Sequence, residues 1–100
     1  MLKKFRTYQL AVNHYHYCAA LSIPAHLKEQ LLRAASSVVL NIAEGSGKPT
    51  PKDRQRIYAI ALGSLRECQA ICDLALLENA ELANLADQLG AHLYRLCHPT

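Results

Sequence analysis

The chain has 100 residues, of which 51% are hydrophobic, and its formal net charge is +3. This length favours one domain over residues 1–100, and the hydrophobic content excludes an intrinsically disordered chain. Few aromatic and turn residues are present (no Trp, one Phe, four Gly and four Pro), which argues against a β-sandwich. Because we find neither a signal-peptide pattern nor an apolar run of membrane-spanning length, we expect a cytoplasmic protein that does not act at a membrane.

The first two helices are predicted over about 5–21 and 24–44. Apolar residues recur at helical spacing from Tyr8 to Ala19. Pro24 favours a break and a new start, because proline disfavours the helical conformation in the preceding residue and suits the first turn of a helix. Gly45 is expected to end the second helix.

The next two helices are predicted over about 51–77 and 80–96. Thr50 is a good N-cap for the third helix, and Asp53 stands three residues later, as in a capping box. Asn79 can cap the fourth helix in the same way. Both starts are therefore indicated by local sequence alone.

Short connections between all four helices predict an all-α protein, an antiparallel up-down-up-down four-helix bundle. Gly63 interrupts the third helix at a cost of about 1 kcal/mol relative to alanine. A glycine at such a position suggests close approach by a neighbouring backbone, or a bend.

Charge is distributed unevenly along the chain. Residues 1–56 carry nine Lys/Arg against three acids, and residues 57–100 carry two against five. In the predicted topology the start of the first helix, the 45–51 connection and the end of the fourth helix meet at one end. That basic end would hold Lys3, Lys4, Arg6, Lys48, Lys52, Arg54, Arg56 and Arg95.

The opposite, acidic end would hold Asp73, Glu78 and Glu81. Clustered lysines and arginines attract nucleic acid through its phosphates, and the alternative is an ordinary solvated helix end. We find no aromatic platform interleaved with the basic residues, as an oligonucleotide-binding sheet would have.

A polar face on the second helix is formed by Arg33, Ser37, Asn41 and Glu44, which follow one another at helical spacing. It is either a solvated stripe or a buried or intersubunit hydrogen-bond network, which Glu67 could join.

The four cysteines are expected to be free thiols that pack in the core. His14–Cys18 and Cys68–Cys72 are pairs spaced by four, whereas zinc sites usually use closer Cys-x-x-Cys pairs. Cys97 and His98 are adjacent in sequence, a spacing that does not bring side chains together on a helix. We therefore expect no metal, no cofactor and no catalytic residue.

Two segments are familiar: Gln30–Gly45 (QLLRAASSVVLNIAEG) and Ile60–Glu67 (IALGSLRE). They resemble the signatures of a four-helix-bundle family that includes proteins encoded in intervening sequences of 23S ribosomal RNA genes and the accessory variability determinants of diversity-generating retroelements. Leu32 stands where the family often has arginine, and Lys48 is the nearest match to a basic residue that often follows the Glu-Gly pair.

The resemblance implies a bundle that assembles as a ring-like homo-oligomer, with a pentamer as the leading expectation, and no enzymatic activity. We assign to packing within the bundle or between subunits Arg33, Ser37, Asn41, Glu44, Gly45, Gly63, Ser64 and Glu67.

The runs Phe5–Leu10 and Leu65–Ile71 look more like the retroelement branch of the family. That branch implies a nucleic-acid-binding accessory protein, with RNA or DNA as ligand, that partners a reverse transcriptase in template-RNA-primed mutagenic cDNA synthesis. The alternative is a scaffold of the ribosomal intervening-sequence type that acts through protein–protein contacts.

Overall fold

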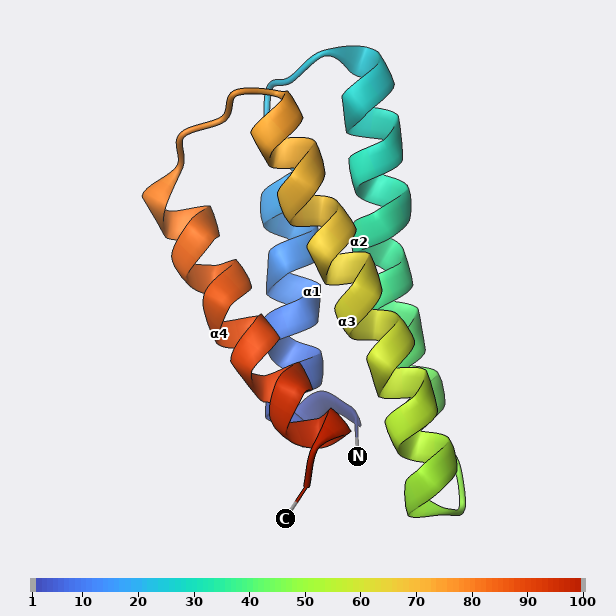
Figure 1. The fold of residues 1–100 in the computed structure, drawn as a ribbon. Coiled ribbons are helices and arrows are strands. Elements are labelled where there is room, and N and C mark those ends of the chain that lie inside the picture. Colours follow the sequence, from blue (N-terminus) through green and yellow to red (C-terminus); the bar gives the residue numbers. More distant parts are fainter. Residues whose placement is uncertain (1, 100) are drawn as a thin grey trace.

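The computed structural model describes residues 2–99 and is helical throughout its four main elements. A short 3-10 helix, Leu2–Lys4, precedes α1 (Arg6–Ala19), α2 (Ala25–Ser46), α3 (Pro51–Leu74) and α4 (Ala80–Cys97). The helices run alternately up and down, with the start of α1 and the end of α4 at the end of the bundle that also carries the α2–α3 connection (Figure 1). Each helix packs on the next, and α4 packs back on α1, in a body of 40 × 22 × 22 Å. The all-α four-helix prediction is confirmed, and the ring-like assembly stays a prediction.

The predicted N-caps of α3 and α4 are both formed. The Asp53 amide donates to Thr50 Oγ1 over 3.2 Å, and the Leu82 amide donates to Asn79 Oδ1 over 3.1 Å. Each bond satisfies a backbone donor that the first turn of a helix leaves without an intrahelical partner. The two helices accordingly begin where the sequence predicts.

The end of α2 differs from the prediction, because Gly45 does not stop the helix. The helix continues to Ser46, and Gly45 is helical and buried. A Cβ added at Gly45 would lie 2.8 Å from Cε1 of the Tyr58 ring. Gly45 therefore allows α2 and α3 to pack closely, and it does not end the helix.

The end of α3 comes three residues earlier than predicted. The Leu76 amide donates to the Asp73 carbonyl and the Leu77 amide to the Cys72 carbonyl, both over 3.0 Å. This pair of bonds is the Schellman motif, which needs a left-handed residue just after the helix. Leu76 holds that position with φ of 54°. Likewise, α1 ends at Ala19, two residues before its predicted end.

The core consists of two clusters of buried apolar side chains. The cluster nearer the basic end is built around Leu10, Ile42, Leu65 and Leu93, and the other around Cys18, Leu31, Cys68 and Leu82. Burying each large aliphatic side chain contributes about 1.5–3 kcal/mol to stability. Cys18 and Cys68 are buried as predicted, whereas Cys72 and Cys97 are half-buried.

The expectation of close backbone approach at Gly63 is wrong within this chain. Gly63 lies on the solvent side of α3, and among residues 2–99 no atom beyond its own helix turn lies within 4 Å of a Cβ added there.

In the same described part of the chain, no helix is long and apolar enough to cross a membrane.

Candidate nucleic-acid interface

The basic end forms as the topology predicts. The start of α1, the α2–α3 connection and the end of α4 lie at the same end of the bundle (Figure 1). Together with the first turns of α3, these segments carry all eight candidate cations, so residues up to 92 positions apart in sequence (Lys3 and Arg95) share one end of the molecule. Glu44 and Asp53 are the acidic side chains on the same segments.

Six of the eight cations are exposed: Lys3, Lys4, Arg6, Lys52, Arg56 and Arg95. The two ion pairs found among residues 2–99 do not involve any of these six. Counterions from the solvent therefore neutralise these charges. A polyanion that binds there releases the counterions, and their release increases the entropy.

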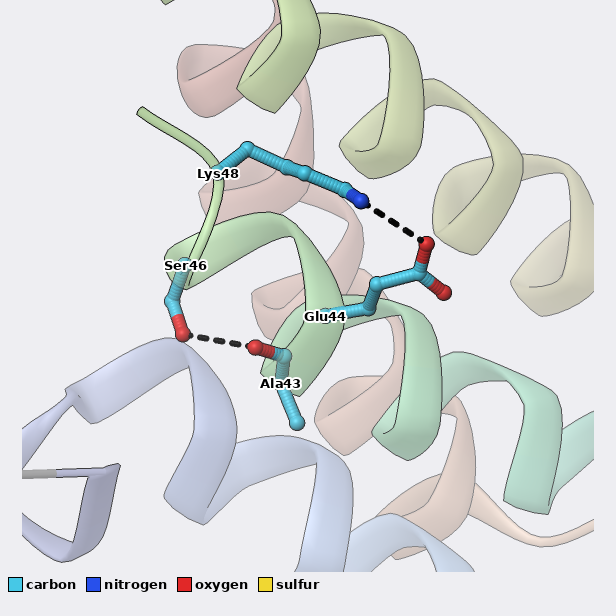
Figure 2. Close-up of polar contacts among 4 residues, drawn as sticks. All are labelled: Ala43, Glu44, Ser46 and Lys48. Atoms are coloured by element: carbon cyan, nitrogen blue, oxygen red, sulfur yellow. Dashed lines mark hydrogen bonds and ion pairs between the residues drawn. The ribbon is translucent and has the colours of Figure 1, made fainter. Parts of the chain in front are cut away.

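The remaining two cations also hold the α2–α3 connection in place. Lys48 Nζ lies 3.6 Å from Glu44 Oε2, and Arg54 Nη1 donates to the Lys48 carbonyl over 2.9 Å. Figure 2 shows the Lys48 side chain reaching back toward Glu44, beside the 2.8 Å bond from Ser46 Oγ to the Ala43 carbonyl. A solvent-exposed ion pair is worth at most about 1 kcal/mol, so a phosphate can compete with Glu44 for Lys48.

An aromatic pair stands at the basic end, contrary to the sequence expectation. Tyr94 and His98, four residues apart at the end of α4, are stacked with ring centroids 4.2 Å apart and an interplanar angle of 29°. The Tyr94 side chain is exposed, at 55% relative accessibility. The sequence shows that Tyr94 and His98 are four residues apart and that Arg95 is next to Tyr94. It does not show that the Tyr94 ring is exposed.

The opposite end is acidic, as predicted. It carries the α3–α4 connection and the exposed side chains of Asp73, Glu78 and Glu81. The Tyr17 hydroxyl lies 3.2 Å from Glu81 Oε2 and 3.1 Å from Asn79 Oδ1, which ties α1 to the start of α4. The molecule is therefore an electrical dipole along its long axis.

Three of the predicted packing residues meet between α2 and α3. Ser37 Oγ and Ser64 Oγ are 2.9 Å apart, and Asn41 Nδ2 donates to the Ser37 carbonyl over 2.8 Å and to Ser37 Oγ over 3.0 Å. All three side chains are half-buried. Each such bond contributes about 0.5–1.5 kcal/mol, so this cluster stabilises the contact of the two helices within one chain.

The other predicted members do not join that cluster. Arg33 pairs with Glu29 at 3.6 Å, and both side chains are largely exposed. Glu67 and Gly63 are exposed on α3, and Glu44 pairs with Lys48. The polar face of α2 is thus part hydrogen-bond cluster and part solvated surface.

Two large apolar side chains on the outer surface were missed by the sequence reasoning. Leu40 on α2 is 66% exposed and Ile60 on α3 is 46% exposed. A helical wheel would have revealed Leu40, because it lies on the side of α2 opposite the buried Val38 and Ile42.

The buried thiols and imidazole are poorly suited to chemistry. The ring nitrogens of His14 lie 3.7 and 3.9 Å from Cys18 Sγ. Burial lowers the pKa of His14 to about 4 and raises the pKa of Cys18 to about 12, and it also raises the pKa of Cys68. A protonated thiol is a weak nucleophile. In the described residues, no three His, Cys, Asp or Glu side chains are grouped so that they could hold a metal ion.

Fold and surface together define a small all-α four-helix-bundle protein with one exposed basic end. The family model of the 23S rRNA-intervening sequence protein matches residues 4–97. Because the match spans nearly the whole chain, the protein belongs to this family. Neither the curated proteins nor the solved structures include a significant match to the chain. The family match confirms the broader resemblance, and the retroelement branch stays a prediction.

Proposed function

We propose that this protein is a non-enzymatic, homo-oligomeric nucleic-acid-binding protein whose basic end contacts phosphates. The observation that carries the proposal is the gathering, at one end, of six exposed cations from three separate segments of the chain. Backbone phosphates are the same in every sequence, so such a surface binds RNA or DNA with little sequence preference and with strong salt dependence.

The test is binding to a labelled structured RNA across a salt series, with charge reversal at two exposed cations. Lys52→Glu with Arg56→Glu should weaken binding and reduce the salt slope by about 2, because each lost phosphate contact reduces it by about 1. Arg66→Glu is the control, since this arginine is exposed but lies away from the basic end. Equal affinity of the first pair and the wild type, or no binding at low salt by folded protein, would contradict the proposal.

The oligomer is proposed to form through the outer surface of α2 and α3. The support is the exposure there of Leu40, Ile60 and Gly63, with open space over the glycine. Gly63→Leu should leave the fold intact and lower the mass measured by light scattering, because the added side chain blocks a neighbouring copy. Ala83→Leu, an exposed position on α4, should leave the mass unchanged. A pentamer is the stoichiometry that the family resemblance favours.

The narrower form of this proposal places the protein beside the reverse transcriptase of a diversity-generating retroelement, with template RNA as its ligand. The local resemblance of Phe5–Leu10 and Leu65–Ile71 supports this form. Co-purification with that polymerase, and a requirement for the protein in cDNA synthesis on the template RNA, would test it.

The second candidate function is a protein-interaction scaffold without a nucleic-acid role. The exposed Leu40 and Ile60 favour it, since large apolar side chains on a surface commonly serve protein contacts. A stable oligomer that does not bind RNA at low salt would place this function first.

A further inference from the structure

The end of α4 presents an aromatic surface among positive charges. Tyr94 is 55% exposed, and its ring stacks on His98, whose Nδ1 lies 3.0 Å from the Tyr94 carbonyl. This contact and the 4.2 Å stacking distance hold the two rings in a defined orientation. The outward face of a ring held in this way is available to a third planar group.

Positive charge lies beside this pair on α4, and more lies at the start of α1. Arg95 follows Tyr94 in α4, and Arg6 begins α1; both are exposed. Burial lowers the pKa of His92, and the charges of Arg95 and Arg6 lower it further. His92 lies about 200° around α4 from Tyr94, because successive helical residues are about 100° apart. Thr7 Oγ1 lies 3.4 Å from His92 Nδ1 and joins α1 to α4 there. The end of α4 and the start of α1 are thus in contact, and Arg95 is the cation next to the Tyr94–His98 pair.

We propose that the stacked Tyr94–His98 pair, beside Arg95, is a binding site for an unpaired nucleobase of a single-stranded segment. Every base has a flat π face, so stacking on an aromatic side chain tolerates all sequences, while Arg95 and the other exposed cations of the basic end contact the flanking phosphates. Bases in a duplex are stacked on one another, so their faces are not available to this pair. The site therefore gives the basic end a preference for loops, bulges and strand ends over duplex.

This inference rests on the proposed nucleic-acid binding and adds the class of ligand. The experiment compares two RNAs at fixed salt: a twelve-nucleotide single strand that carries one 2-aminopurine, and a twelve-base-pair duplex. In the wild type, single-strand binding should quench 2-aminopurine fluorescence, as stacking on an aromatic ring does.

Tyr94→Ala should weaken single-strand binding by roughly 5- to 150-fold, which corresponds to about 1–3 kcal/mol for one stacked base, and should remove the quenching. Duplex affinity should change less than twofold. Tyr94→Phe should retain both properties, because the ring is kept. His26→Ala is the matched control, as an exposed ring on α2 at the acidic end. Circular dichroism of each variant checks that the fold is unchanged.

The results separate the two proposals. If Tyr94→Ala binds the single strand as tightly as the wild type while both bind duplex, the base site is wrong and the phosphate-binding end stands. If Tyr94→Ala weakens single strand and duplex equally, the tyrosine does not select unpaired bases and the base site is again wrong. If the wild type binds neither RNA, the proposed function itself fails.

Discussion

Replacing Leu76 with glycine should make this protein more stable. Leu76 is the left-handed residue of the Schellman motif at the end of α3, with φ of 54°. For a residue with a Cβ, that conformation brings the side chain close to the following carbonyl oxygen, whereas glycine adopts it without strain. The Leu76 side chain is 88% exposed, so its removal forfeits little apolar burial.

The expected gain follows from two opposing terms. The left-handed conformation costs a non-glycine residue about 1–2 kcal/mol. Glycine also makes the unfolded chain more flexible, which offsets about 0.4–1 kcal/mol of that gain. The free energy of unfolding of Leu76→Gly should therefore rise by about 0.5–1 kcal/mol, and for a domain of this size Tm should rise by about 2–8 °C.

Thermal and urea unfolding followed by circular dichroism measure this change. Leu76→Ala is the matched control, because it removes the same exposed side chain but keeps a Cβ, and so keeps the strain. We expect it to change the free energy of unfolding by less than about 0.5 kcal/mol, as surface substitutions usually do. A loss of stability in Leu76→Gly, or an equal gain in Leu76→Ala, would show that the strain of Leu76 does not limit stability.

Two further predictions concern the glycines and the buried histidine. Gly45→Ala should destabilise the fold by about 1–2 kcal/mol in urea unfolding, because its Cβ would meet the buried Tyr58 ring at 2.8 Å and overpacking exceeds the gain in helix propensity. Gly90→Ala, whose Cβ would make an ordinary contact with Leu65 Cδ2 at 3.5 Å, should instead add about 0.5–1 kcal/mol, and a similar loss at both positions would refute the packing argument. The pKa of His14 falls from 6.5 to about 4 on folding, so the unfolded chain binds a proton first as the pH drops. Stability should therefore be lost from pH 6.5 down to about 4, by about 3 kcal/mol in total, and no further through this group below that. His14→Gln should flatten this pH dependence whereas His16→Gln, at an exposed position of the same helix, should retain it; identical pH profiles of the two variants would exclude His14 as the cause.

Local signals in the sequence predicted a structural feature correctly wherever the contact that forms it joins residues only a few positions apart. The caps at Thr50 and Asn79 depend on a side chain and an amide three positions away, so they can be recognised in a short window. The helical periodicity likewise indicated four amphipathic helices. The charge separation needed one further step, the antiparallel order, which the short connections supplied.

The ends of α2 and α3 show where such signals failed. Gly45 resembles a helix stop in sequence, and only the Tyr58 ring, thirteen residues away on the next helix, explains why a glycine is needed in the helix there. Leu76 has a left-handed conformation, in which glycine is the usual residue. Because leucine stands there, no residue preference in the sequence indicated where α3 ends.

Some features of the candidate site could likewise be predicted from the sequence, and others could not. The sequence by itself determined which cations share one end of the bundle, because helix order and connection length fix that. Only the tertiary structure decided which cations form contacts within the chain, as Lys48 and Arg54 do at the α2–α3 connection. It also decided which aromatic ring faces solvent, as that of Tyr94 does. The physical reason is that spacing along one helix sets which residues share a face, whereas burial depends on the neighbouring helices that cover that face.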